Sequence, residues 1–279
     1  MNTKREIGPE RPCHTLPSLL LTKTVRITVV GCGATGSAIA AGLPYLHQAL
    51  VAWGHPYGLD VIFVDGDRVS RVNCVRQPFS ESEVGLYKAS VLAGRINLFW
   101  GLGWRGAPAF LDERWKDETD LVIGCVDSRK SRALIARSAA CSSCHYWLDI
   151  GNNADSGQFV LGQPENRYSK TSELRLPTVA ELFPEIIDAR LDKKDRLPPC
   201  SAIEALERQE PFVNQILAYQ SLALLARLFR YGKISHHGGF LNLTTGRMSS
   251  LAVDPTIWQR LMSHPERHDS AKQETLRRA

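Results

Sequence analysis

The sequence lacks the long apolar and long basic stretches that mark two large classes of protein. None of its apolar runs approaches the ~18 residues that a membrane-spanning helix needs, so we expect no membrane partner. Lys and Arg are spread along the chain and the net charge is only +5, so we expect no direct nucleic-acid binding. This mild positive charge is compatible with binding small anions such as nucleotides.

Signals for disulfides and for secretion are also missing. The 7 cysteines are odd in number and scattered, which argues against a disulfide framework and favours a reducing compartment. The N-terminal stretch MNTKREIGPERPCHT contains no apolar signal core. These absences predict a cytoplasmic protein.

What is present is an ordinary globular composition. The chain has 279 residues, of which 43% are apolar and 23% charged, and this is enough to bury a sizeable core. The sequence contains no internal repeat and no low-complexity segment. The length predicts one large domain or two small ones.

Strand and helix patterns alternate through the first 150 residues. Short β-branched or apolar runs predict buried strands, and apolar residues at helical spacing between them predict helices. This alternation predicts an α/β fold: a Rossmann-like, doubly wound, mostly parallel sheet. The expected strands are 24–30, 60–67, 120–128 and 146–151, and the expected helices follow the glycine turn at 31–37 and cover 83–100 and 129–140.

The rest of the chain changes character. A stretch with five prolines predicts a long crossover loop, and a later helical pattern ends at Gly232. Two alternating runs around TTGR predict a C-terminal antiparallel hairpin extension of the sheet. The expected organisation is an N-terminal arm at 1–23, one domain at 24–255 that includes a crossover loop at 162–200, and a polar tail at 256–279.

A glycine motif lies between the first predicted strand and its helix. In the stretch GCGATG, Gly31 permits a tight turn, Gly33 lets the backbone approach a phosphate, and Gly36 allows close packing of helix on strand. The helix start then offers free N–H groups to an anion. The motif predicts a nucleotide site, and the alternative is a tight turn without a ligand.

Polar residues suited to a nucleotide follow the second strand. Asp65 ends that strand, where an acid accepts the ribose hydroxyls, or is simply a solvated carboxylate. The amides and cations behind it exceed what a dinucleotide needs, which argues against an NAD(P)-dependent oxidoreductase. They suit a triphosphate whose pyrophosphate must leave. The amides are Asn73 and Gln77, the cations are Arg76 and Lys88, and a second acid, Asp67, precedes them.

The next predicted strand ends in another acid. Asp127 would lie beside the expected nucleotide crevice, where a carboxylate can hold Mg²⁺ that bridges phosphates. Taken singly, each of these polar groups is equally compatible with a solvated surface.

Together the motifs resemble a known superfamily. The order GxGxxG, DxDxVxxxNxxRQ, a Lys and a strand ending VDS is similar to the ThiF/MoeB/HesA and ubiquitin-activating enzymes. The phrases IGCVDSR, YWLDIGN and DSGQFVLG are most similar to the ThiF-family branch of the bacterial PRTRC cassette. The resemblance runs from about residue 24 to about residue 255.

This resemblance implies an adenylating enzyme. Such enzymes use ATP and Mg²⁺ to adenylate the C-terminal carboxylate of a small ubiquitin-like or sulfur-carrier protein, releasing pyrophosphate, and they are commonly homodimers. A catalytically inactive scaffold with the same nucleotide fold is the alternative. The implied roles are a phosphate turn at Gly31, Gly33 and Gly36, a ribose contact from Asp65, phosphate contacts from Asn73, Arg76 and Lys88 supported by Gln77, support of arginines or Mg²⁺ by Asp67, and Mg²⁺ binding by Asp127.

Two cysteine features remain. Cys200 follows two prolines and precedes a predicted helix, where the helix dipole lowers the pKa of a thiol. Its place resembles that of the superfamily's thioester-forming cysteine, and the alternative is a structural cysteine. Cys141 and Cys144 form a CxxC pair, but a second pair is missing, so a structural zinc is not expected.

Overall fold

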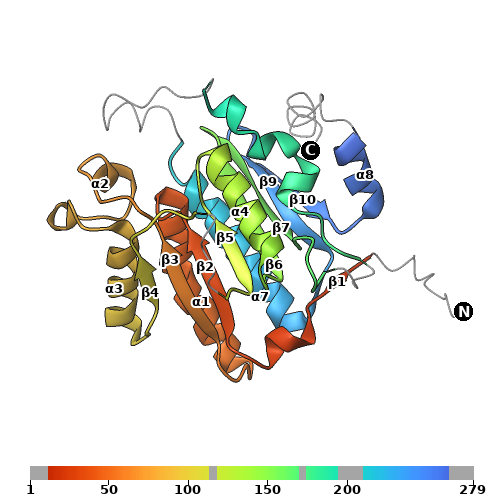
Figure 1. The fold of residues 1–279 in the computed structure, drawn as a ribbon, viewed down its shortest axis with the longest axis horizontal. Helices are drawn as coiled ribbons and strands as arrows, with labels where there is room; N and C mark the ends of the chain where they lie inside the picture. The colour runs from red at the N-terminus through yellow and green to blue at the C-terminus, as the bar shows by residue number, and fades with distance from the viewer. Residues whose placement is uncertain (1–11, 113–117, 170–173, 194–209, 264–279) are drawn as a thin grey trace, which may run out of the picture.

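The computed structural model describes residues 12–112, 118–169, 174–193 and 210–263. Within them the chain forms one eight-stranded sheet covered by helices on both faces, and a separate two-stranded sheet (Figure 1). The main sheet has the strand order β10-β9-β7-β6-β5-β2-β3-β4. The α/β fold with a mostly parallel sheet and a C-terminal antiparallel group is confirmed.

The parallel half of the sheet contains five strands. β2 lies between β3 and β5, and β4 and β6 extend the sheet on either side. Strand order therefore reverses direction at β2, and in such sheets ligands bind beyond the carboxyl ends of the strands at this point. The bounds are Val25–Val30 for β2, Leu59–Val64 for β3, Arg105–Ala107 for β4, Leu121–Gly124 for β5 and Tyr146–Asn152 for β6.

The antiparallel half begins at β7, which runs back along β6. β9 pairs with β7, and β10 pairs with β9 as the predicted hairpin. β7 was not predicted from the sequence, because two of its first three residues are half-buried and polar and its two glycines weaken the strand pattern. The bounds are Ser156–Gly162 for β7, His236–Asn242 for β9 and Arg247–Ala252 for β10.

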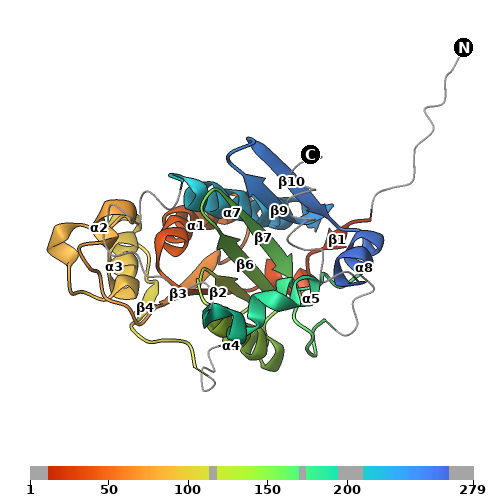
Figure 2. The ribbon, with the colours of Figure 1, turned by 90° about the horizontal axis from the view of Figure 1, so that it is seen from above.

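Two long helices cover one face of the sheet. α1 (Ala34–Ala52) and α7 (Val213–Tyr231) pack on each other, and α4 (Arg129–Cys141) and α5 (Val179–Leu182) lie on the opposite face (Figure 2). Gly232 ends α7 in the left-handed conformation, as predicted. Short helical segments complete the chain: η1 at Ser18–Leu21, α2 at Asn73–Arg76, η2 at Glu81–Glu83, α3 at Lys88–Trp100, η3 at Pro184–Ile187 and η4 at Ala189–Lys193.

Both ends of the described chain are more ordered than expected. β1 (His14–Thr15), in the expected arm, pairs with β8 (Lys233–Ile234), and Leu20 is buried. The polar tail expected from residue 256 is instead the helix α8 (Pro255–Ser263) up to residue 263. The reason is Trp258, which is buried and donates its indole N–H to the Ala252 carbonyl at 3.2 Å.

None of the helices in the described part of the chain combines the length and the apolar character that a membrane crossing requires.

Candidate functional site

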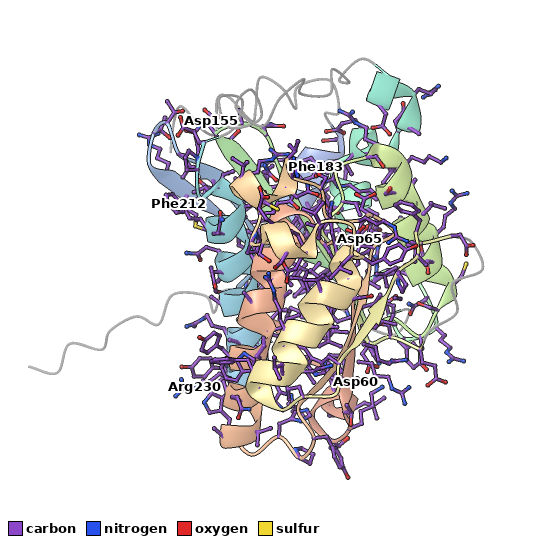
Figure 3. The ribbon with its side chains drawn as sticks, turned by 90° about the vertical axis from the view of Figure 1, so that its left-hand side faces the viewer. Asp60, Asp65, Asp155, Phe183, Phe212 and Arg230 are labelled. Carbon is purple, nitrogen blue, oxygen red and sulfur yellow. The ribbon has the colours of Figure 1, made fainter. Side chains whose placement is uncertain are left out.

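A cavity of about 840 Å³ opens at the carboxyl ends of β2, β3, β5 and β6. It therefore lies where the strand order reverses. Figure 3 shows Asp65 at this end of the molecule, whereas Asp60, at the other end of the same strand, lies at the opposite end with Arg230. Most of the predicted site residues line this cavity: Gly31, Gly33, Asp65, Asp67, Arg76, Gln77, Lys88 and Asp127.

The glycine turn connects β2 to α1. Gly31 has φ +93°, and a Cβ there would stand 2.5 Å from the Cys125 carbonyl oxygen. A Cβ on Gly33 would meet nothing within 4 Å, so the backbone is open to an approaching ligand. Gly36 does not line the cavity; a Cβ on it would stand 1.9 Å from the Gly31 carbonyl oxygen. The geometry is that of the tight turn and close helix–strand packing expected of this motif.

Gly36→Ala is expected to destabilise the fold by at least about 3 kcal/mol, because the added methyl overlaps backbone that cannot move away cheaply. Urea unfolding measures the effect. Gly94→Ala is the matched control: Gly94 lies within α3 with open space around it, so alanine there should stabilise by about 0.5–1 kcal/mol. A Gly36→Ala protein as stable as the wild type would contradict the packing argument.

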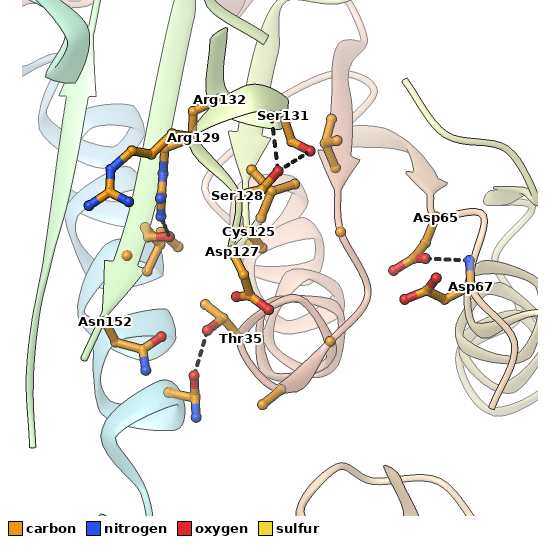
Figure 4. Close-up of a pocket in the computed structure, with 18 of the residues that line it drawn as sticks. Thr35, Asp65, Asp67, Cys125, Asp127, Ser128, Arg129, Ser131, Arg132 and Asn152 are labelled. Atoms are coloured by element: carbon orange, nitrogen blue, oxygen red, sulfur yellow. Dashed lines mark hydrogen bonds between the residues drawn. The ribbon is translucent and has the colours of Figure 1, made fainter. Parts of the chain in front are cut away.

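Asp65 holds two backbone segments at the cavity wall. One carboxylate oxygen accepts from the Cys32 N–H, and the other accepts from the Asp67 N–H at 2.7 Å (Figure 4). Burial raises the pKa of Asp65, and the two backbone N–H groups and Lys88 oppose this rise. The acid at the end of β3 thus fixes the glycine turn and keeps lone pairs for a hydroxyl ligand.

Lys88 begins α3 and lies beside Asp67. Its ammonium group is 3.2 Å from an Asp67 carboxylate oxygen, and the Lys88 side chain is only 7% exposed, against 58% for Asp67. Both residues line the cavity. Asp67, for which the sequence left two roles open, therefore orients a buried lysine.

The short helix α2 contributes one of its two predicted residues to the cavity. Arg76 ends this helix and lines the cavity, as does Gln77 just after it. The Gln77 side-chain oxygen is buried without a hydrogen-bond partner among the described residues. Asn73 does not line the cavity; its side-chain oxygen accepts from the N–H and hydroxyl of Ser70 at 2.9 and 3.0 Å. The structure therefore does not bring Asn73 to the cavity with the other residues predicted to contact the phosphates.

The start of α4 forms the next part of the wall. Asp127 follows β5 and lines the cavity, and among the described residues no hydrogen bond or ion pair engages its carboxylate. Ser128 caps the helix by accepting from the Ser131 N–H at 3.1 Å. Asp192, from η4, accepts from the Arg129 and Lys130 N–H groups at 3.0 and 3.2 Å. An internal carboxylate thus occupies the positive end of α4.

A buried ion pair in the same wall was missed by the sequence analysis. The Arg132 Nε lies 3.2 Å from each carboxylate oxygen of Asp149, whose side chain is fully buried in β6. Burial raises the pKa of Asp149, and Arg132 opposes this rise. The usable signal was a charged residue inside the apolar strand pattern YWLDIG, since buried charges require a partner.

The structure bears differently on the two cysteine features. Cys200 lies outside the described residues. Cys144 is buried and Cys141 is exposed, so the CxxC pair does not face one shared space. Within the described ranges, no three side chains of His, Cys, Asp or Glu gather closely enough to hold a metal ion by themselves.

Solved structures with this fold are similar over most of the chain. PaaA matches with a TM-score of 0.54 and 14% identity, covering 82% of this chain and 64% of PaaA. E. coli MccB matches with 0.52 and 17% identity, covering 83% and 63%, and MccB with ATP with 0.53 and 15% identity, covering 83% and 64%. Such identities show the fold, and the chain spans less than two thirds of the length of these proteins.

Sequence comparison gives the family. No curated protein matches the chain. A family profile does, and it covers residues 17–257, which include the glycine turn, the whole cavity wall and the antiparallel strands. The chain described here is therefore a member of the ThiF family.

Proposed function

We propose that this chain is an ATP-dependent adenylating enzyme that activates the C-terminal carboxylate of a small ubiquitin-like or sulfur-carrier protein. The observation that carries this proposal is the shared cavity: an acid suited to ribose, two cations and a free carboxylate surround the glycine turn. Family membership adds support. MccB, which has the same fold, has been solved with ATP, and this supports ATP as the nucleotide.

The proposed reaction makes one bond and breaks one. A carboxylate oxygen of the partner attacks the α-phosphorus of ATP, and the bond from that phosphorus to the bridging oxygen of the β-phosphate breaks. Acyl-adenylate and pyrophosphate result. Because the nucleophile is already an anion, no general base is required, and the site must position two anions and screen their repulsion. Arg76 supplies a planar fork for the departing pyrophosphate, and Lys88 a point charge.

The residues present fit Mg²⁺ delivered with the nucleotide. Mg²⁺ takes one or two protein carboxylates and completes its shell with phosphates and water. Asp127 offers such a carboxylate at the cavity wall. Bound there, Mg²⁺ would screen the phosphate charge.

Release of pyrophosphate tests the proposal. The protein is incubated with ATP, Mg²⁺ and the small ubiquitin-like protein of the same cassette, and released pyrophosphate is measured. Release that depends on the partner's free C-terminus is expected. Binding of ATP and of the partner without release would favour the non-catalytic scaffold, and hydride transfer with NAD(P) would favour the oxidoreductase.

The thioester step forms a separate prediction. Asp192 and Ala154 line the cavity, and the Glu210 N–H donates to the Ala154 carbonyl at 2.7 Å. The chain therefore enters and leaves the segment 194–209 at the cavity rim. The described residues that flank this segment thus lie at the cavity, where the proposed acyl-adenylate would form.

A thiol-labile adduct between the wild-type protein and its partner is expected after incubation with ATP. Cys200→Ala should abolish that adduct and leave pyrophosphate release intact. Mass spectrometry under non-reducing conditions gives the measurement, and Cys13→Ala serves as the control. An adduct that persists in Cys200→Ala would remove the thioester role from this residue.

Three finer points belong to the same proposal: membership of the PRTRC branch, a bacterial cytoplasmic location and a homodimer. They rest on the sequence resemblance. A pull-down with ATP followed by mass spectrometry identifies the partner and any acyl link, and sedimentation equilibrium gives the number of subunits.

A further inference from the structure

Two side chains outside the predicted nucleotide motif converge at one end of the cavity. A methyl group placed on Gly151 would stand 2.7 Å from the Arg132 Nη2 and 3.0 Å from the Gln158 Nε2. Both nitrogens are thus within about 6 Å of each other over β6. Because any larger residue at 151 would push them away, glycine is what lets two donors approach the same spot. Both side chains also line the cavity.

Arg132 is held rigidly and still has donors to offer. Its Nε is fixed by the buried carboxylate of Asp149, and its Nη2 makes a long contact of 3.5 Å with the Ile150 carbonyl. A guanidinium carries five N–H groups. None of the described residues accepts a hydrogen bond from the others, and Arg132 lines the cavity, so donors remain for a ligand.

Gln158 is in a similar position. It projects from β7, is half-buried, and its side chain has no hydrogen-bond partner among the described residues. A half-buried amide without a partner and a buried guanidinium with unused N–H groups line one cavity in the described structure, which is typical of a site for an oxygen-bearing ligand.

The position of this pair within the cavity indicates which ligand. In Figure 4, Asp65 and Asp67 lie on one side, Arg132 and Asn152 on the other, and Asp127 between them. If the proposed ATP places its ribose at Asp65 and its phosphates near Asp127, the side of the cavity at Arg132 is left for the substrate that carries the carboxylate. The guanidinium is already paired with Asp149, so it suits a carboxylate with one negative charge better than a polyphosphate.

We propose that Arg132 and Gln158 bind the terminal carboxylate of the acyl substrate and present it to the nucleotide. This inference rests on the proposed function and adds two substrate-contacting residues to it. Asp149 and Gly151 are positioning residues: the first fixes the guanidinium, and the second makes room for it. The ligand class is a peptide ending in a free carboxylate, approaching along the end of β6.

Binding of two peptides tests the assignment. The probe is a fluorescein-labelled hexapeptide ending in Gly-Gly, with either a free carboxylate or a carboxamide terminus, titrated by anisotropy against the full chain. The wild type is expected to bind the acid at least about tenfold more tightly than the amide. Gln158→Met and Arg132→Gln should each bring acid binding down to the amide level and leave ATP affinity within about twofold.

Controls separate this assignment from a structural role. Arg137→Gln, on the exposed face of the same helix, should retain the wild-type preference. Gln158→Met removes no hydrogen bond within the described structure and should fold normally, so it remains informative even if Arg132→Gln unfolds. Equal binding of acid and amide by the wild type, including no binding of either, overturns the assignment. So does loss of ATP affinity with an intact acid preference.

Failure of the proposed function gives a different result. A protein that prefers the acid peptide but neither binds ATP nor releases pyrophosphate would keep the carboxylate site and lose the adenylation proposal.

Discussion

Replacing Asp127 or Arg76 by alanine is expected to slow ATP–pyrophosphate exchange by about 10²–10³-fold each, or about 2–4 kcal/mol of activation free energy. Both side chains line the cavity: Arg76 supplies positive charge where the proposed pyrophosphate departs, and Asp127 would hold the Mg²⁺ that screens the phosphates. Initial rates with saturating ATP and partner measure the loss. Neither residue belongs to the core, so the free energy of unfolding, measured in urea, should stay within about 0.5 kcal/mol of the wild type.

Arg71→Ala is the matched control for Arg76→Ala. Arg71 is exposed in the same loop and does not line the cavity, so its removal should leave the exchange rate near that of the wild type. If Arg76→Ala behaves like Arg71→Ala, the assignment of α2 to the phosphates is wrong.

The second prediction with a large effect is that the free energy of unfolding falls in acid. His237 is fully buried in β9 and donates its Nδ1–H to the Leu161 carbonyl at 2.8 Å, while its Nε2 has no partner among the described residues. Burial, with smaller contributions from His14 and His236, lowers the pKa of His237 from 6.5 to about 4, and the hydrogen bond to the Leu161 carbonyl opposes this lowering. In the unfolded chain the group takes up its proton near 6.5, so the unfolded state binds more protons below that pH.

The stabilising contribution of neutral His237 is therefore complete above pH 6.5 and is lost as the pH falls from 6.5 towards 4. Since one pKa unit corresponds to about 1.4 kcal/mol, the loss reaches about 3 kcal/mol. Urea unfolding at pH 7.5 and at pH 4 measures it. His237→Asn, whose amide can still donate to the Leu161 carbonyl, should lose about 3 kcal/mol less over this interval. Parallel pH curves for the two proteins would contradict the argument.

Four of the five parallel strands followed from local patterns, because β2, β3, β5 and β6 contain short apolar runs. β4 was not predicted, because it has only three residues and none of them is fully buried. β7 and α8 depend on tertiary contacts instead. β7 gains its stability from pairing with β6 and β9, and α8 from the burial of Trp258, neither of which a local pattern reveals.

Some residues of the candidate site were likewise predictable from sequence motifs, whereas others depend on tertiary contacts. Gly31, Asp65 and Lys88 belong to motifs with recognisable spacing, so the sequence predicted that they lie together, and all three line the cavity. Arg132 and Asp192 could not be found like this, because each partner lies in a different element and each residue alone looks like solvated helix surface. The side-chain orientation of Asn73, which turns back to Ser70, likewise depends on geometry within its loop.

The contact of Asp192 with α4 has a consequence for how an anion can enter. The starts of α1 and α4 both line the cavity, at Gly33 and at Arg129, and a helix start attracts negative charge. At α4 the carboxylate of Asp192 already accepts from the free N–H groups, so an incoming anion finds that helix start occupied. Of these two helix starts, the proposed nucleotide would therefore place its phosphates at α1 rather than at α4.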